Sequence, residues 1–166
     1  MKRKLNLILL FFAIIVTGNL FAQNGCKSFA ATVGASTANS KYISVSFETS
    51  SDGYHIFGLS LDGIGYSRNL KKQLDYTVDN HILALGLYYK SKLSSTRNFN
   101  TSFFIGGAGG SDNKSFVYYP FGGFEESLFL QEGLQLTFNQ KVIYLLGLKH
   151  INNWQPCLNI GFKFSL

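Results

Sequence analysis

The end of the chain alternates strictly between apolar residues and polar or small ones. Leu158, Ile160, Phe162, Phe164 and Leu166 occupy every second position, and the residues between them are Asn, Gly, Lys and Ser. A period of two places the two sets on opposite faces of a β-strand, whereas a helix repeats every 3.6 residues. The chain therefore ends in a strand with one wholly apolar face.

The same period recurs in seven segments upstream, and no segment after residue 22 shows a convincing helical period. Only 14% of the residues are charged and 16% are aromatic, which excludes a disordered chain and is typical of β-structure. In the sixth segment the phase leaves open whether Glu125 or Glu126 faces inward. The alternation that predicts the eight strands is clearest at residues 28–35, 42–48, 56–62, 82–89, 98–105, 118–128, 134–146 and 158–166.

Strand and loop lengths predict an all-β fold, an eight-stranded antiparallel up-and-down β-barrel that crosses an outer membrane. The predicted strands run for about 9 to 12 residues, close to the length at which a tilted strand spans a bilayer. Alternate connections are short and the others include longer loops, a pattern typical of outer-membrane barrels. The short connections are residues 51–53, 94–96 and 131–133, and the longer ones are 65–78, 110–115 and 147–153.

Residues 1–22 have the layout of a cleaved secretory signal peptide. Three basic residues near the start precede an apolar run at 7–16, and Ala22 ends a cleavage site. A helix of that run would span about 15 Å, half of a bilayer core, so a membrane anchor is the weaker interpretation. A lipoprotein signal needs a Leu three residues before its Cys, and Gln23 stands there relative to Cys26.

Residues 23–166 form the predicted barrel domain. The 15 basic residues less the three in the leader leave 12 against 9 acidic ones, a net charge of +3. Because a charge of this size without a basic cluster is no argument for nucleic acid, we expect no direct nucleic-acid binding.

The polar face of each strand lines the lumen and the apolar face contacts outer-membrane lipid. Eight strands leave an interior just filled by side chains, so charges of both signs can pair there and plug it. A soluble barrel such as a lipocalin is the alternative, and strand length with nearly charge-free apolar faces favours the membrane form. The predicted lumen residues are Glu48, Asp62, Glu125, Lys141 and Lys163, and the predicted lipid-facing residues of the last strand are Leu158, Ile160, Phe162, Phe164 and Leu166.

The last segment also has a distinctive order of residue types. Trp154 is followed by a polar residue and Pro, then by Gly and by Lys163 between apolar neighbours. In this it resembles the C-terminal strand of the TraO family of conjugative transposon proteins. Shorter stretches are similar in the same order along the chain: Lys41–Phe47, Tyr54–Leu59, Asp75–Thr77, Phe116–Tyr118 and Gly122–Gly123.

The resemblance implies an outer-membrane component or accessory of the apparatus that moves DNA between Gram-negative cells. It implies other conjugation proteins as partners, with the barrel-assembly machinery recognising the last strand. The acidic residue usual in the sixth strand of the family corresponds to Glu125 or Glu126, and the loop that follows the fifth strand is shorter here. The resemblance supplies no catalytic residues.

Residues that could support chemistry are few. His55, His81 and His150 lack metal-ligand spacing, so we expect surface or girdle positions for them. The glycine run 106–110 lacks the Lys-Ser/Thr and the helix of a phosphate loop, so we interpret it as close packing. We therefore predict no cofactor and no metal.

The two cysteines are far apart in the predicted barrel. Cys26 begins the first strand at one rim, and Cys157 begins the last strand at the opposite rim, roughly 25–30 Å away. A disulfide needs Cα atoms within about 7 Å, so we predict two free thiols.

The function expected from the sequence is a non-catalytic, structural or interaction role in conjugation. One alternative is a small barrel that acts as an adhesin or membrane stabiliser. Another is a lipid-modifying outer-membrane enzyme, which would need a Ser–His–acid constellation; His150 has no adjacent Ser.

Overall fold

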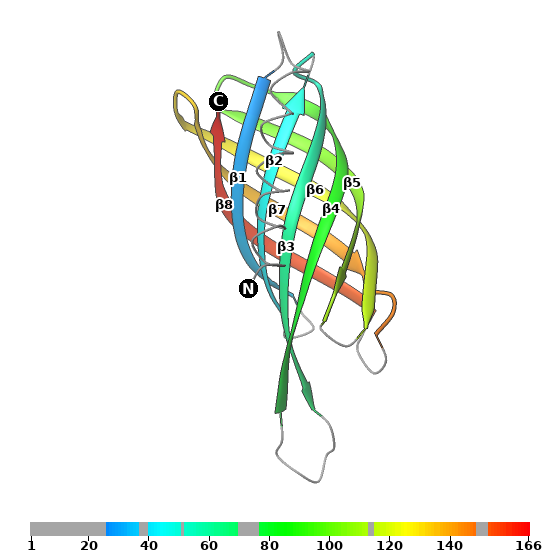
Figure 1. Cartoon of the computed structure of the whole chain (residues 1–166). Helices are drawn as coiled ribbons and strands as arrows, with labels where there is room; N and C mark the ends of the chain where they lie inside the picture. Colours follow the sequence, from blue (N-terminus) through cyan, green and yellow to red (C-terminus); the bar gives the residue numbers. More distant parts are fainter. Residues whose placement is uncertain (1–25, 37–39, 51, 70–76, 113–114, 149–152) are drawn as a thin grey trace, which may run out of the picture.

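The computed structural model describes residues 26–36, 40–50, 52–69, 77–112, 115–148 and 153–166, of which 67–69 and 77–80 are described by their backbone alone. The predicted signal peptide lies outside the described residues. The described chain forms one closed β-barrel (Figure 1). Within those ranges the structure contains no helix with the length and apolar character needed to cross a membrane.

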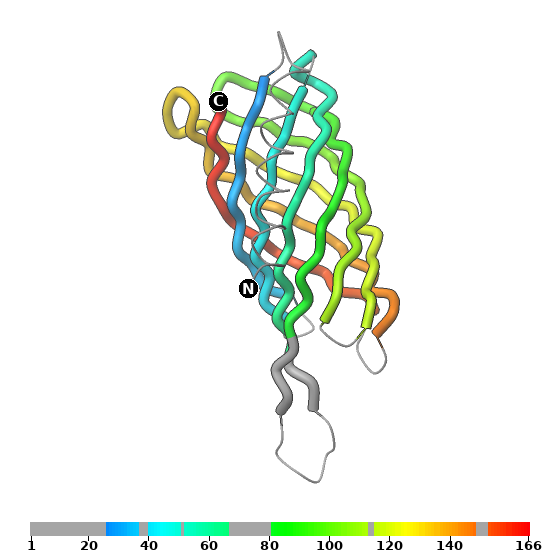
Figure 2. The backbone as a smooth tube through the Cα atoms, viewed as in Figure 1, coloured from blue at the N-terminus to red at the C-terminus, as the bar shows by residue number. Residues whose placement is uncertain are grey.

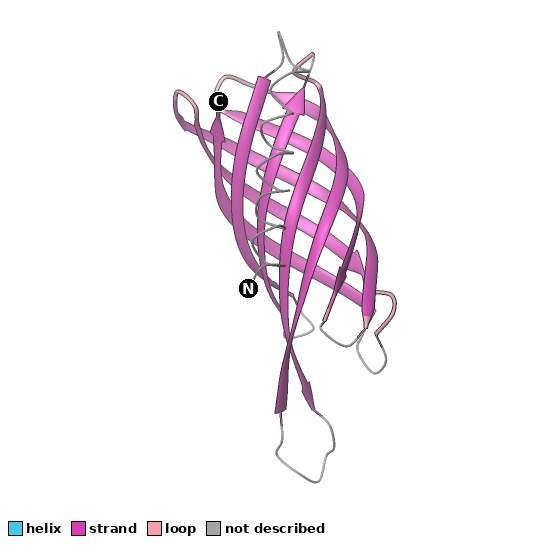
Figure 3. Cartoon of the chain, viewed as in Figure 1, coloured by secondary structure: helices cyan, strands magenta, loops and turns pink. Residues whose placement is uncertain are grey.

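Every strand is antiparallel to the next along the chain, and β1 pairs with β8 to close the wall (Figure 3). This confirms the predicted up-and-down barrel of eight antiparallel strands. The strands are β1 (Cys26–Ser36), β2 (Ser40–Ser50), β3 (His55–Asn69), β4 (Thr77–Ser95), β5 (Phe99–Ser111), β6 (Phe116–Gln131), β7 (Leu134–Tyr144) and β8 (Trp154–Ser165).

The strands slant around the wall (Figure 2). Their side chains alternate between the inside and the outside of the barrel. On β8, for example, Asn159 and Lys163 are buried, whereas Leu158 and Ile160 are exposed. The unbroken pairing of β5 with β6 also settles the sixth strand, where Glu125 points inward and Glu126 outward. The alternation in the sequence therefore defines two faces with opposite chemistry.

Three turns lie at one end of the barrel, which we call the short-turn end, and the other end is the long-loop end (Figure 1). Gly53 and Gly133 take φ angles of 75° and 78° in two of these turns, a conformation that glycine adopts without strain. The turn predicted at 94–96 is wrong, because β4 continues through a register shift to Ser95 and the turn is at 96–98.

Four strands are longer than the roughly 12 residues expected at most. β5 has 13 residues, β3 has 15, β6 has 16 and β4 has 19. β3 and β4 remain paired from Gly65 opposite His81 to Asn69 opposite Thr77, so half of the predicted 65–78 loop is a ribbon that continues past the barrel. Gly65 and the polar residues of this stretch resemble a loop in sequence, which is why period-two alternation does not reveal the extension.

Candidate functional site

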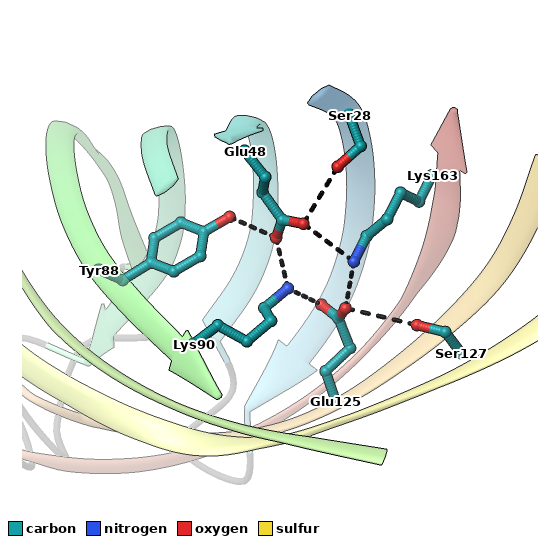
Figure 4. Close-up of polar contacts among 7 residues, drawn as sticks. All are labelled: Ser28, Glu48, Tyr88, Lys90, Glu125, Ser127 and Lys163. Atoms are coloured by element: carbon teal, nitrogen blue, oxygen red, sulfur yellow. Dashed lines mark hydrogen bonds and ion pairs between the residues drawn. The ribbon is translucent and has the colours of Figure 1, made fainter. Parts of the chain in front are cut away.

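Four charged side chains meet in the lumen near the short-turn end (Figure 4). They come from the even-numbered strands and alternate in sign: Glu48 on β2, Lys90 on β4, Glu125 on β6 and Lys163 on β8. Lys90 Nζ lies 2.7 Å from Glu125 Oε2 and also contacts Glu48. Lys163 Nζ lies 3.0 Å from Glu48 Oε2 and also contacts Glu125. We call these four residues the charge ring.

The charge ring is electrically neutral and almost wholly buried. No more than 7% of any of its four side chains is exposed. In a buried network of this kind, loss of one partner leaves an uncompensated charge and costs about 3–5 kcal/mol. The ring therefore joins four strands of the wall across the lumen and holds their side chains in one arrangement.

Hydroxyl groups complete the bonding of the two carboxylates. Tyr88 donates to Glu48 Oε1 at 2.7 Å, and Ser28 donates to Glu48 Oε2 at 3.2 Å. Ser127 Oγ donates to Glu125 Oε1 at 3.4 Å. Ionised carboxylates only accept hydrogen bonds, so these donors fill positions that the two lysines leave open.

A second ion pair lies further toward the long-loop end. Lys141 Nζ is 3.6 Å from Asp62 Oδ2, and Asp62 also accepts hydrogen bonds from Ser44 at 2.6 Å and Tyr119 at 2.8 Å. The Lys141 ammonium also lies 4.0 Å from the centre of the Phe121 ring, within the range of a cation–π contact. Hydroxyl groups and an aromatic side chain therefore provide contacts to Asp62 and Lys141. In the charge ring, a second ion pair provides the corresponding contacts.

Aromatic side chains fill the lumen between the two charged groups. The ring centres of Tyr88, Phe104 and Phe121 lie 6.3–6.4 Å from one another. A cavity of about 50 Å³ beside them is lined by Ser60 and Asn159, among others, and has room for a few water molecules. Apolar side chains continue the packing toward the long-loop end.

A polar cavity of about 230 Å³ opens on the other side of the charge ring, at the short-turn end. Glu48, Glu125 and Lys163 line its inner side, and Asn100 and Gln135 line its walls. The interior is therefore a shallow polar vestibule that ends at the charge ring, followed by a packed core.

The outer face of the wall is apolar. The five residues predicted to face lipid on the last strand, Leu158 to Leu166 at alternate positions, are 46–78% exposed on the outside. Aromatic residues gather near both ends, with Trp154 against Tyr144 at one end and Phe57 against Tyr89 at the other. An apolar band between two aromatic girdles is typical of barrels that sit in a bilayer.

All five predicted lumen residues are buried inside the barrel: Glu48, Asp62, Glu125, Lys141 and Lys163. The structure assembles three of them in the charge ring and the other two in the second pair. Sequence reasoning missed the fourth member of the ring, Lys90, which is only 1% exposed. The signal was present, because Lys90 continues the inward series of Ala84, Gly86 and Tyr88 by one more step.

The cysteines do not pair. Cys26 is exposed at the start of β1, and Cys157 is buried opposite Ser36 at the far end of that strand. The prediction of two free thiols is confirmed. The reason given for it is confirmed as well, because the length of a whole strand separates the two cysteines.

The histidines and glycines show no site chemistry in the described part of the chain. His55 stacks on Tyr89 at the short-turn end and His81 is exposed, whereas His150 lies outside the described residues. Within the described ranges, no group of three or more His, Cys, Asp or Glu side chains could hold a metal ion. A Cβ on Gly106 or Gly110 would lie within 2.4 Å of a backbone carbonyl oxygen of β4, so these glycines permit close packing.

Comparison with known proteins identifies the type of barrel. No family model matches the chain, and no curated protein matches it. Among solved structures, the N-terminal β-barrel domain of OprF from Pseudomonas aeruginosa is similar at 12% identity and a TM-score of 0.59, over 87% of this chain and 98% of that one. A major outer membrane protein from Thermus thermophilus is similar at 11% identity and a TM-score of 0.57, over 87% and 100%.

A structure from the de novo design of transmembrane β-barrels is similar at 13% identity and a TM-score of 0.58, covering 85% of this chain and 95% of that one. At these identities the likeness concerns the fold alone. Together with the apolar outer face and the paired charges inside, it shows that this chain has the fold of the small outer-membrane β-barrels.

Proposed function

We propose that this protein is a non-catalytic outer-membrane barrel that serves as a component or accessory of a conjugative transfer apparatus. The observation that supports the membrane part is the contrast between the two faces of the wall. The outside is an apolar band between aromatic girdles, and the inside is closed by the charge ring. A wall of this kind anchors a protein in lipid and leaves its two ends for contacts.

Export by the leader and insertion by the barrel-assembly machinery, which would recognise β8, are part of the proposal. Outer-membrane barrels have short periplasmic turns and longer outer loops, so the short-turn end faces the periplasm. The polar vestibule then opens to the periplasm, and the β3–β4 ribbon extends outside the cell. The closed lumen makes the barrel a scaffold and not a solute channel.

The conjugative role is supported by the TraO-like residues. The longest stretch of resemblance makes up the whole of β8, and the other described stretches belong to β2, to β3 with the turn before it, and to β6. Because these strands form the wall, the resemblance supports a shared barrel, and partner contacts fall to the loops and the periplasmic rim.

Two measurements test the proposal in order. The full chain, produced in a Gram-negative host, should fractionate with the outer membrane and migrate differently on a gel before and after boiling. A soluble, unshifted protein would instead support the lipocalin-like interpretation. Deletion of the gene should then lower the frequency of plasmid or transposon transfer without slowing growth.

Unchanged transfer from a protein that does reside in the outer membrane would refute the conjugative role alone. An adhesin or membrane stabiliser would then be indicated by lost attachment or by increased sensitivity to detergent. Mating-pore genes beside this gene would support conjugation before any experiment.

A further inference from the structure

One polar side chain interrupts the apolar outer wall at mid-height. Gln140 is exposed on the outer face of β7, between Phe138 and Val142 on the same face of its own strand. Its direct neighbours across the wall are Phe124 on β6 and Leu158 on β8. All four neighbours are exposed apolar residues, and the outward Glu126 is a diagonal neighbour, two residues from Phe124 on β6.

Gln140 is too deep to reach water. It lies six residues from Leu134, where β7 begins, and each residue of a tilted strand advances about 2.5 Å along the barrel axis. This places it about 15 Å above the short-turn end, within an apolar band about 25 Å tall. The described part of the chain gives its side-chain amide no hydrogen-bond partner.

The other strands lack a polar residue at this height. Outward positions in the middle of the described wall hold only apolar residues or glycine. They include Val33, Val45, Leu61, Leu87, Ile105, Gly122 and Ile160. Gln140 is thus the single polar residue at this height of the described wall, because the outward Glu126 lies opposite Phe138, nearer the short-turn end. An unpaired amide in hydrocarbon is strongly unfavourable unless another molecule bonds it.

The chemistry of the amide indicates what that molecule is. A glutamine side chain carries both a donor and an acceptor, so two of them can bond each other reciprocally. A two-fold axis along the membrane normal brings the same residue of a second copy to the same depth. A charged partner residue would suit a carboxylate or an ammonium, whereas an amide is self-complementary.

We propose that the β6–β7–β8 face is a homodimer interface with Gln140 at its centre. The proposal rests on the outer-membrane location proposed above. Lipid tails are as apolar as Leu, so apolar residues alone do not bring membrane segments together; hydrogen bonds and close packing do.

The wall beside Gln140 permits a close approach. Gly122 faces outward on β6, opposite Val142, and because glycine has no side chain, nothing protrudes from the wall at this position. A Cβ at Gly122 would lie 3.4 Å from the Phe104 carbonyl oxygen, which is ordinary contact, so packing within the barrel does not demand glycine.

The test measures association of the full chain in detergent micelles and in phospholipid vesicles. We expect a dimer by sedimentation equilibrium, and a dissociation constant about tenfold higher for Gln140→Leu because two hydrogen bonds between membrane segments are lost. The heat-dependent shift on a gel should stay unchanged, showing that the variant barrel is folded.

Cross-linking locates the interface. In a Cys26→Ser, Cys157→Ser background, Val142→Cys should form a disulfide-linked dimer, and adding Gln140→Leu should reduce its yield. Leu87→Cys is the matched control, because it is an outward position at similar height on β4, across the barrel, and should remain monomeric.

Monomeric protein in the membrane, or equal cross-linking at both positions, would overturn the interface. Cross-linking of Val142→Cys to a different membrane protein in cells, without self-cross-linking, would overturn the choice of a second copy. A protein that fractionates as soluble would refute the proposed location instead, so the two failures are distinguishable.

Discussion

The inner and the outer face of the barrel wall differ in what holds them together. Inside, charges are paired and close packing decides which residues fit; a Cβ at Gly123 would lie 1.9 Å from the Gln140 carbonyl oxygen. Outside, Gly107 has nothing nearer to such a Cβ than the Tyr119 carbonyl oxygen at 3.9 Å. On the inner face of each strand, stability therefore depends on specific partner residues. On the outer face it depends on the surrounding solvent or lipid.

The charge ring provides the strongest test of the inner face. Lys90→Leu leaves Glu48 and Glu125 with one cation between them, so we expect a loss of about 3–5 kcal/mol in the free energy of unfolding. Urea unfolding in lipid vesicles, followed by the fluorescence of Trp154, the only tryptophan, measures it.

Lys92→Leu is the matched control, because that lysine also points inward on β4 but lines the vestibule. Its effect should be below about 1 kcal/mol, because Lys92 is only partly buried and solvent screens its charge. The double variant Lys90→Leu with Glu125→Leu keeps the Glu48–Lys163 pair and should recover part of the loss; no recovery would contradict the interpretation.

The outer face is tested by a charge in its middle. Leu87 is 65% exposed on the outside of β4, and Leu87→Lys should cost about 2–4 kcal/mol in a bilayer. Ser91→Lys lies on the same face nearer the short-turn end and should cost only about 0–1 kcal/mol. Equal losses at the two depths would count against a lipid-facing wall.

Adding one methyl group to a glycine on each face is expected to have a smaller effect on stability than adding a charge. Gly123→Ala should lower the free energy of unfolding by about 1–3 kcal/mol, because the backbone of β7 must move. Gly107→Ala should be neutral or stabilise by up to about 1 kcal/mol, since the unfolded chain loses freedom and the folded one has space. The same unfolding assay compares them, and a reversed order would contradict the assigned faces.

The smallest effect on stability is expected at Asp52, which lies in a turn and belongs to neither face of the wall. The backbone N–H groups of His55 and Tyr54 bond Asp52 in an exposed turn and hold the pKa of its carboxyl below its ordinary 3.8. Asp52 thus contributes stability above the unfolded pKa, and the contribution is lost as pH falls through the lower folded value. Asp52→Asn should reduce the change in stability between pH 7 and pH 3 slightly, while a proton titration by NMR reports the pKa directly.

Much of the fold could be predicted because period-two alternation depends only on which face each residue occupies. That pattern sufficed for eight strands, for four of the five lumen residues and for the outward residues of β8. The position of Glu125 required the pairing itself, since two adjacent glutamates satisfy either phase until the neighbouring strand is known. The extension of β3 and β4 had no such pattern, because glycine and the polar residues that make up most of it are equally common in loops.

The candidate site was predicted only in part for a different reason. Five charges could be assigned to the lumen one by one, but which of them meet depends on the slant of the strands. Lys90 and Glu125 are neither adjacent in sequence nor directly paired across strands. Their contact follows from long side chains that cross the lumen, which no local pattern records.

The pairing of the strands also has a consequence for how the barrel closes. Following paired residues once around the wall leads from Cys26 back to β1 at Ser36, a stagger of ten residues. Closure slipped by one residue would turn the faces over, so the nearest competitor is a slip of two. That slip would move Lys163 along β1 by about 7 Å, away from Glu48. The charge ring spans the seam between the chain ends, and it thereby acts as a register lock that distinguishes the correct closure from its closest error.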